Sequence, residues 1–202
     1  MNATDAYARL RRLGVPVVDT ADAAAALGQT SAAASQTLTR LARAGLVTSI
    51  RHGTWWVNGT LDPLRLPEYL TAPLPSYVSL QTALHRHGLI EQIPTVVYAV
   101  SLARTQRLST TAGAFSIHHV APEVFGGFEE LPSGVKLATA EKALFDFAYL
   151  SGGRSRLFTS LPELELPRGF RKKDLARWVQ KIPSERGRTL TSESLEGFLA
   201  GA

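Results

Sequence analysis

The sequence predicts an α+β protein, in which an N-terminal winged helix-turn-helix is followed by a mixed α/β C-terminal domain. Three observations favour this fold class. Three short helical segments and a strand pair with a basic tip fill residues 1–58. Prolines then cluster over 59–76, which is typical of a domain boundary. Helical and strand-like segments alternate over 77–202. We therefore expect two domains, 1–58 and 77–202, joined by a Pro-rich linker over 59–76.

The helices of the first domain are predicted from their caps and stops. An amphipathic helix opens the chain, and Thr20 is expected to cap a second helix over 21–27. Thr30 or Ser31 caps a third helix, which ends before Gly45. The link between the second and third helices is about as short as the turn in a helix-turn-helix.

Two strand-like runs follow the third helix. Residues 46–50 and 54–57 are joined by Arg51-His52-Gly53, which predicts a hairpin with a basic tip. Trp55 and Trp56 occupy adjacent strand positions, so their side chains should face opposite ways. We expect one of the two indoles to pack on the third helix.

The third helix has one apolar stripe. With Leu38 as the reference on a wheel of about 100° per residue, Ala34, Leu41 and Ala42 fall on the same side. The opposite face is small near the N-terminus, carries an amide in the middle and is basic towards the end. The residues expected on that face or its flanks are Gln36, Thr37, Thr39, Arg40 and Arg43.

A face of this kind suits the major groove of double-stranded DNA. Short polar side chains can contact base edges, while arginine reaches phosphate or guanine. The alternative is that the helix is an ordinary core element with a solvated polar face, in which Ser and Thr act only as caps. The candidate DNA-binding residues are Ser31, Ser35, Gln36, Thr39, Arg40, Arg43, Arg51 and His52.

Composition limits the remaining possibilities. The chain has 202 residues, of which 45% are hydrophobic and 19% charged, as expected for a globular protein. No apolar run approaches the roughly 18 residues that span a bilayer, and no signal peptide is evident. Without cysteine, disulfides, thiol nucleophiles and thiolate metal sites are excluded. We expect a cytoplasmic protein with no membrane partner.

Charge is unevenly distributed along the chain. Residues 1–60 carry six basic and three acidic side chains, 61–150 carry six and eight, and 151–202 carry ten and six. The excess of positive charge towards both ends of the chain favours an anionic partner. The basic segment 168–188 has three possible roles: a solvated face, an additional DNA contact, or docking on an acidic toxin or RNA.

The second domain is predicted to mix helices and strands. Its strongest helix lies over 139–150, with Ala140, Leu144, Phe147 and Ala148 on one side. The other expected elements are a helix over 79–87, strands over 95–101 and 115–120, a basic helix over 172–181 and a short last helix over 192–199.

No pattern in this domain predicts an enzyme, a cofactor or a metal site. The pairs His85/His87 and His118/His119 do not share a chelating face. Lys142 and Asp146 are four residues apart on a predicted helix, so we expect an ordinary surface ion pair. Phosphate-binding loops and dinucleotide fingerprints are lacking. The Gly-rich stretch over 151–156 is better explained by helix termination than by phosphate binding.

Several motifs resemble one known family. The run 38-LTRLARAGLVTSIRHGTWWV-57 resembles the N-terminal winged helix of the AbiE-type abortive-infection antitoxins of type IV toxin–antitoxin systems. The stretch 77-YVSLQTALHRHGLIEQIP-94 is similar to the start of their C-terminal domain. The most specific motif is the core of 136-KLATAEKALFDFAYL-150, which reads Ala-Thr-x-Glu-Lys-Ala-Leu. The resemblance covers roughly 4–180.

This resemblance implies a function in bacterial phage defence. A protein of the family binds inverted repeats in its own promoter as an autorepressor and counteracts a nucleotidyltransferase-type toxin through its C-terminal domain, generally without a stable complex. Two molecules per operator are implied, and the free protein could be a monomer. Two alternatives remain: a DNA-binding regulator without a toxin partner, or an enzyme that modifies a toxin or nucleotide. Substitution of Glu141 or Lys142 would test the enzyme.

Overall fold

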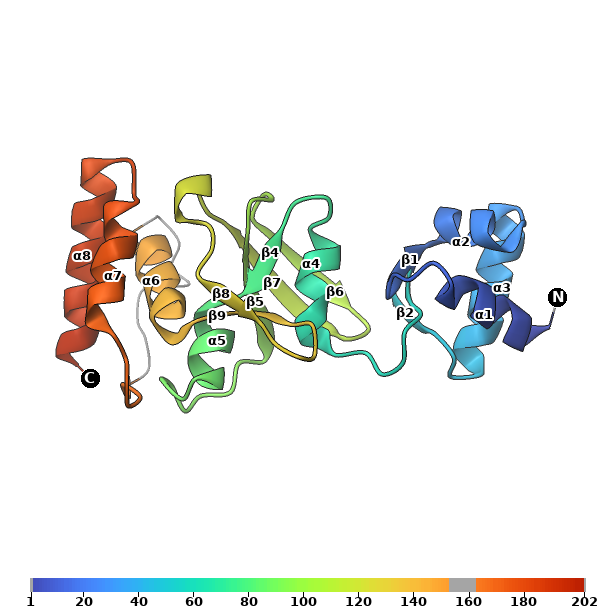
Figure 1. Cartoon of the computed structure of the whole chain (residues 1–202), viewed down its shortest axis with the longest axis horizontal. Helices are drawn as coiled ribbons and strands as arrows, with labels where there is room; N and C mark the ends of the chain where they lie inside the picture. Colours follow the sequence, from blue (N-terminus) through green and yellow to red (C-terminus); the bar gives the residue numbers. More distant parts are fainter. Residues whose placement is uncertain (1, 153–162, 202) are drawn as a thin grey trace. The chain divides into compact units, whose positions relative to one another are not determined.

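The computed structural model describes residues 2–152 and 163–201, within which the chain forms eight α-helices and two β-sheets (Figure 1). This is an α+β architecture. The chain divides into two compact units. One unit holds the residues up to Pro63 together with Ser109–Gly113, and the other holds Leu64–Leu108 and the chain from Ala114 on. Most of the Gly-rich stretch over 151–156 lies outside the described residues.

The first unit contains three helices and an antiparallel sheet with strand order β1-β3-β2. Leucines from all three helices meet the sheet in one core, in which Leu10, Leu27 and Leu38 pack with Trp55. The elements of this unit are α1 (Ala3–Arg11), β1 (Val17–Asp19), α2 (Thr20–Leu27), α3 (Ser31–Arg43), β2 (Thr48–Arg51) and β3 (Thr54–Trp56).

Side-chain caps fix where these helices begin. Thr30 caps α3 as expected, because its hydroxyl accepts a hydrogen bond from the backbone N–H of Ala33 at 3.3 Å. The expected cap of α2 was wrong by one residue. Asp19 is the N-cap and accepts from the N–H of Asp22 at 2.8 Å, while Thr20 is already helical. The Thr20 hydroxyl instead accepts from the indole N–H of Trp55.

The segment 59–76, expected as a linker, is largely structured. From Leu64 on it belongs to the second unit, where it forms the 3-10 turn η1 (Pro63–Arg65) and helix α4 (Leu66–Leu70). Leu66 is fully buried. Pro67 does not break α4, because it lies in the first turn, where a backbone N–H has no helical acceptor.

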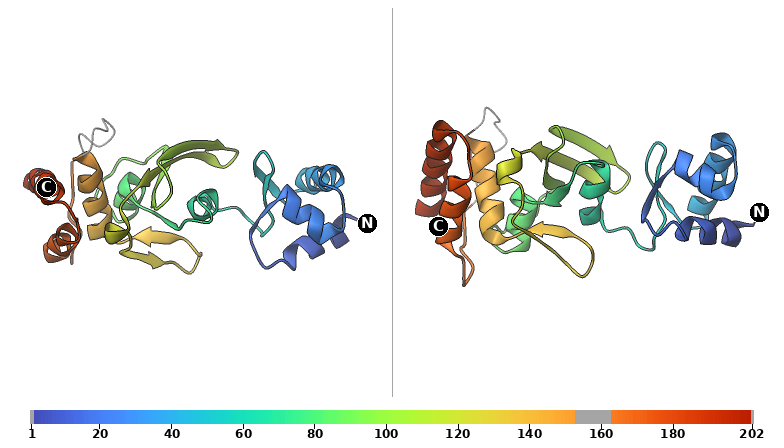
Figure 2. Two further views of the ribbon diagram at one scale, coloured as in Figure 1. Left: turned by 90° about the horizontal axis from the view of Figure 1, so that it is seen from above. Right: turned by 45° about the horizontal axis from the view of Figure 1, so that its top comes forward.

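The second unit is built on a six-stranded mixed sheet with strand order β6-β7-β5-β4-β9-β8. Figure 2 shows the ribbon of this unit from two further sides. Strands β4 and β9 are parallel, as are β5 and β7, whereas β4 pairs with β5 and β8 with β9 in antiparallel register. The strands are β4 (Ser76–Val78), β5 (Val96–Ser101), β6 (Gln106–Thr110), β7 (Gly113–His119), β8 (Phe128–Glu130) and β9 (Lys136–Ala138).

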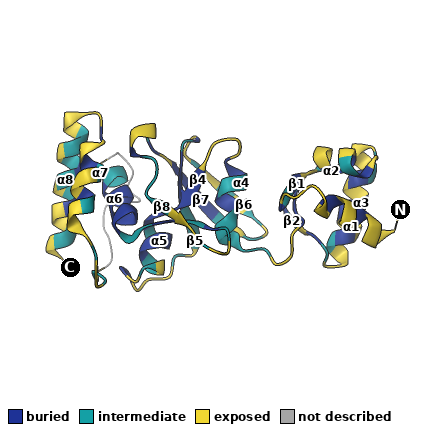
Figure 3. Cartoon of the chain, viewed as in Figure 1, coloured by how far each residue is buried: buried dark blue, intermediate teal, exposed yellow. Residues whose placement is uncertain are grey.

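Helix α6 (Ala140–Ser151) is the central helix of this unit. It packs against α5 (Leu80–Arg86), α7 (Lys172–Gln180) and α8 (Glu185–Ala200). All residues from Glu141 to Ala148 are consequently buried, not only one side as the sequence predicts (Figure 3). Helix α8 is also longer than the expected segment. A short 3-10 turn, η2 (Pro122–Val124), follows β7.

None of the helices in the described part of the chain combines the length and apolar character needed to cross a membrane.

Candidate nucleic-acid interface and buried polar network

Helix α3 turns its apolar stripe inward and its polar face to solvent. Ala34, Leu38 and Leu41 are buried in the first unit, as the helical wheel predicts. The side chains on the opposite face are exposed, and so is the hairpin tip. The exposed candidates are Ser31, Ser35, Gln36, Thr39, Arg40, Arg43, Arg51 and His52.

The helical wheel predicts Thr37 on a flank of the polar face, but the structure buries its side chain. Its side chain is buried, with only 3% of the residue exposed, and its hydroxyl donates to Oε1 of Gln29 at 3.1 Å. The same hydroxyl accepts from a guanidinium N–H of Arg40 at 3.3 Å. Thr37 therefore links an exposed arginine to the turn between α2 and α3.

The charges on α3 itself have one sign. Residues Ser31–Arg43 include no carboxylate, and the last turn carries Arg40 and Arg43. The acidic residues nearest in sequence, Asp19 and Asp22, serve as the cap and first turn of α2. The amino end of α3 thus keeps its partial positive charge without a carboxylate on the same helix, which favours a nearby anion.

The hairpin tip is held close to the start of α2. Gly53 has a φ of +76°, which permits the tight turn between β2 and β3. Its carbonyl accepts from the backbone N–H of Thr20 at 2.9 Å. Arg51 donates from Nε to the hydroxyl of Thr54 at 3.5 Å, a long hydrogen bond that leaves the rest of the guanidinium exposed. The tip therefore presents Arg51 and His52 from a fixed backbone.

The two tryptophans of β3 differ in their surroundings. Trp55 packs in the core of the first unit together with Leu38 and Leu41 of α3, which confirms the expectation for one indole. Trp56 is fully buried, and its indole N–H donates to the carbonyls of Asn58 and Gly59 at 3.0 and 3.1 Å.

The second unit contains a buried ion pair where the sequence predicts a surface pair. Lys142 donates from Nζ to Oδ1 of Asp146, and both side chains are 0% exposed. The expectation of a surface pair was wrong because α6 is covered on several sides, which the spacing of four residues cannot reveal. Two hydroxyls complete the site: Ser79 and Tyr77 donate to Oδ2 of Asp146 at 2.7 and 3.1 Å.

Aromatic rings enclose the ammonium group of Lys142. Its Nζ lies 4.5 Å from the ring centre of Trp178 and 4.6 Å from that of Phe145, which are cation–π distances. Burial raises the pKa of the Asp146 carboxyl and lowers the pKa of the Lys142 ammonium, and the attraction between the two groups opposes both shifts. Burial also raises the pKa of the Tyr77 hydroxyl. The network joins β4, α6 and α7 through one charge pair.

Glu141, the neighbour of Lys142, lies on a different side of α6. Its Oε1 accepts from the backbone N–H of Arg171 at 2.8 Å. Glu141 also lines a cavity of about 450 Å³ together with His87, Glu129 and Thr139. The enzyme alternative named Glu141 and Lys142. Glu141 borders a cavity, whereas the side chain of Lys142 is fully buried.

The histidines take part in separate local contacts. Nε2 of His87 lies 2.7 Å from the carbonyl of Ala138, and Nδ1 of His85 lies 3.2 Å from that of Ile90. His118 is buried beside the hydroxyl of Ser116, whose Oγ is 2.8 Å from Nε2. Burial lowers the pKa of His118 to about 4, with a smaller contribution from Arg107. In residues 2–152 and 163–201, no group of three or more potential ligands could hold a metal ion.

Three basic side chains of the segment 168–188 contact partners within it. Arg171 and Arg177 both bind the carboxylate of Asp174, at 2.8 and 3.0 Å. The ammonium of Lys181 lies 3.9 Å from the ring centre of Trp178. Lys172 and Lys173 are exposed.

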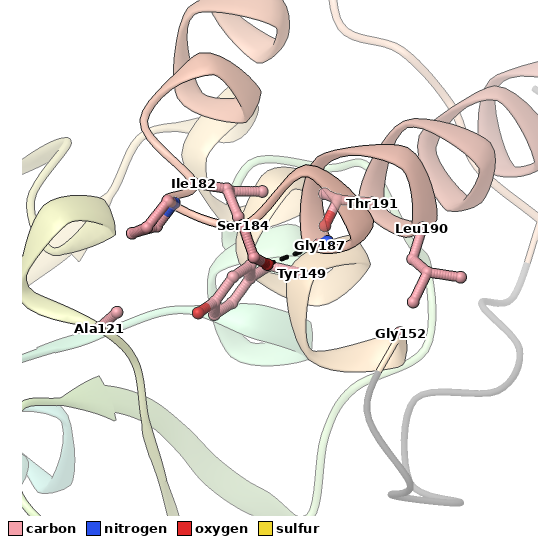
Figure 4. Close-up of a pocket in the computed structure, with 9 residues that line it drawn as sticks. Ala121, Tyr149, Gly152, Ile182, Ser184, Gly187, Leu190 and Thr191 are labelled. Carbon is pink, nitrogen blue, oxygen red and sulfur yellow. Dashed lines mark hydrogen bonds between the residues drawn. The ribbon is translucent and has the colours of Figure 1, made fainter.

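A further cavity, of about 370 Å³, lies between the end of α6 and the start of α8 (Figure 4). Tyr149, Ser184 and Thr191 contribute hydroxyl groups to its lining, and Ser184 accepts from the N–H of Gly187 at 3.1 Å. The described residues that line it include no carboxylate, amine or imidazole. The cavity therefore offers neutral hydroxyls and apolar surface and no acid–base pair.

The sequence matches no protein-family model and no curated protein. The resemblance to AbiE-type antitoxins therefore stays a prediction from the motifs. Sequence reasoning missed the burial of Thr37 and its bond to Gln29, and the roles of Tyr77, Ser79 and Trp178 around Lys142. Of these residues, only Gln29 could have been suspected from the sequence, because a polar side chain in a short turn can form a hydrogen bond to the following helix.

Proposed function

We propose that the first unit is a winged helix-turn-helix that binds double-stranded DNA, with α3 in the major groove and the Arg51–His52 tip on the backbone. One observation carries this proposal. Eight polar or basic side chains predicted to contact DNA are exposed on α3 and the adjoining hairpin tip, and no carboxylate lies on α3. Such a surface combines groups that contact bases with groups that contact phosphates.

We further propose that the chain acts as an autorepressor and antitoxin, with a nucleotidyltransferase-type toxin as functional partner. Support comes from the motif that resembles the antitoxin family. Its Thr139 caps α6 by accepting from the N–H of Lys142, and its Lys142 forms the buried pair with Asp146. The motif residues thus form the polar centre of the second unit, which gives a physical reason for the residue types at these positions.

The DNA proposal is tested by binding of the full chain to a duplex from its own promoter and to an unrelated duplex, with salt titrated. We expect tighter binding to the promoter duplex, and an affinity that falls with salt because phosphate contacts release counterions. Equal, weak binding to both duplexes would contradict the repressor function.

The antitoxin proposal needs a separate experiment. Co-expression with the product of the neighbouring gene should restore growth if that gene encodes a toxin. Promoter binding without such rescue would favour a regulator that has no toxin partner. For the enzyme alternative, Glu141→Gln is the informative variant, because Glu141 borders a cavity, while loss of Lys142 would disturb the buried pair.

A further inference from the structure

Three residues form a hydrogen-bonded chain at the edge of the α3 face. The guanidinium of Arg40 donates to the hydroxyl of Thr37 at 3.3 Å, and that hydroxyl donates to Oε1 of Gln29 at 3.1 Å. Arg40 is exposed, Thr37 is buried and Gln29 is half-buried in the turn between α2 and α3. The chain thus runs from the helix surface into the turn.

We propose that Arg40, Thr37 and Gln29 form a clamp for one backbone phosphate of the DNA duplex. In this clamp, Arg40 and Gln29 supply the donors, and Thr37 is a positioning residue that does not touch the phosphate. The inference rests on the proposed DNA-binding function. It adds two residues, Thr37 and Gln29, to the interface and gives Arg40 a specific role.

The hydrogen-bonding capacity of each group supports these roles. A threonine hydroxyl has one donor, which Gln29 takes, and it accepts from Arg40. With Oε1 bound to Thr37, the side-chain amide of Gln29 keeps two N–H donors, which have no partner within the described residues. Four further N–H donors remain on the Arg40 guanidinium. The Arg40 end of the chain therefore presents donors only, and the Gln29 end presents two donors beside an Oε1 that already accepts from Thr37.

Charge selects an anion as the ligand. Arg40 forms no ion pair within the described residues, and α3 carries no carboxylate. A guanidinium and an amide N–H₂ group that are both joined to one hydroxyl suit phosphate oxygens, which accept several hydrogen bonds at once. Phosphodiester oxygen is the chemical group that meets these requirements on duplex DNA.

The position of the guanidinium favours the backbone over a base. Its bond to Thr37, one turn earlier on α3, draws the charge towards the start of the helix instead of letting the side chain extend outwards. Side chains on a helix already tilt towards its amino end. An arginine held in this way has a shorter reach into the groove, so it should contribute affinity more than sequence discrimination.

The test is a double-mutant cycle on the full chain, measured by fluorescence anisotropy. Thr37→Val removes the hydroxyl and keeps the shape, Thr37→Ser keeps the hydroxyl, and Arg40→Ala removes the charge. Each variant is titrated with the promoter duplex and with an unrelated duplex at several salt concentrations. Thermal unfolding of every variant reports on the fold. Gln29→Met provides a second route to the clamp if Thr37→Val unfolds.

We expect Arg40→Ala to weaken binding to both duplexes by about tenfold and to reduce the slope of log K against log salt by about 0.9, the value for one phosphate contact. Thr37→Val should weaken binding about three- to tenfold when Arg40 is present, and by less when Arg40 is absent, because the hydroxyl then positions only Gln29. Thr37→Ser should bind as the wild type does. Gln29→Met should weaken binding to both duplexes.

Equal effects of Thr37→Val with and without Arg40 would overturn the clamp, as would loss of binding in Thr37→Ser with an intact fold. A change confined to the promoter duplex would also contradict it, because a phosphate contact is independent of sequence. The proposed repressor function fails separately, if the wild type does not distinguish the two duplexes. The cycle can still be read on the unrelated duplex in that case, and wild-type protein that binds neither duplex contradicts both proposals.

Discussion

The polar groups of α3 and those of α6 have nearly the same spacing in sequence but opposite environments. Thr37 and Arg40 are three residues apart, and Lys142 and Asp146 are four apart, so each pair meets on one side of its helix. Arg40 reaches solvent, whereas Lys142 and Asp146 are both 0% exposed. Spacing therefore brings two side chains together, and the surrounding elements decide what the contact does.

The two regions should also respond differently to substitution. Loss of a charge at the exposed face removes an interaction with a partner and leaves the free protein folded. Loss of one member of the buried pair leaves an uncompensated charge in the interior, which costs stability before any function is measured. The predictions follow this difference from a buried charge, through packing, to a buried histidine, and most are paired with an exposed or unhindered control position.

Asp146→Asn should be the most damaging of these substitutions. The ammonium of Lys142 would lose its carboxylate while it stays enclosed by aromatic rings, and removal of one partner of a buried pair costs about 3–5 kcal/mol. Chemical denaturation monitored by circular dichroism measures the change. The double variant Lys142→Met/Asp146→Asn should lose less than the two single variants together. Strict additivity would show that the charges are not coupled.

Leu38→Ala should destabilise the first unit by about 2–5 kcal/mol, because Leu38 is fully buried in its core. The matched control is Gln36→Ala, an exposed position two residues earlier on the same helix, which should leave stability nearly unchanged. The melting temperatures of the two variants compare the stability contributed by the buried stripe of α3 with that contributed by its polar face. Similar melting temperatures for the two variants would contradict the orientation of the helix.

Gly127→Ala should destabilise the second unit by about 1–3 kcal/mol through two effects. Gly127 has a φ of +74°, and a Cβ there would lie 2.5 Å from Cζ2 of Trp178 and 2.9 Å from Cγ of Lys142. Gly88→Ala is the control, because Gly88 has a φ of +72° with no atom within 4 Å of the added Cβ. The excess loss of stability in Gly127→Ala over Gly88→Ala measures how tightly Trp178 and Lys142 pack against Gly127. Equal losses of stability in the two variants would show that backbone strain alone accounts for the effect.

The sequence predicted the elements whose signals are local. The cap at Thr30 and the buried stripe at Leu38 and Leu41 follow from residue types within one helix. Strands β4 and β9 were not predicted, because each has three residues and is defined by its partner. Val78 pairs with Leu137 across 59 positions of sequence, and a run of three residues carries no periodicity.

The candidate sites show the same limit. Exposure of the α3 face could be predicted, because a single apolar stripe implies a polar side opposite. The burial of Thr37 could not, since it depends on Gln29 from the preceding turn. Lys142 and Asp146 were expected at the surface because a spacing of four residues on a helix is typical of an exposed ion pair. Their partners Tyr77 and Ser79 lie on and just after β4, more than 60 residues earlier.

The pH dependence of stability also separates interior from surface. His118 is buried, and its pKa of about 4 in the folded chain lies below the ordinary value of 6.5. Between these values the unfolded chain binds more protons, so stability should rise with pH through this window, be fully present above about 6.5 and be lost as pH falls towards 4. His118→Gln should flatten the dependence between pH 4 and 6.5, whereas His119→Gln, at the exposed neighbouring position, should keep it. The measurement is the denaturation midpoint at several pH values across this range. If the midpoint of His118→Gln depends on pH as strongly as that of the wild type, a group other than His118 causes the dependence.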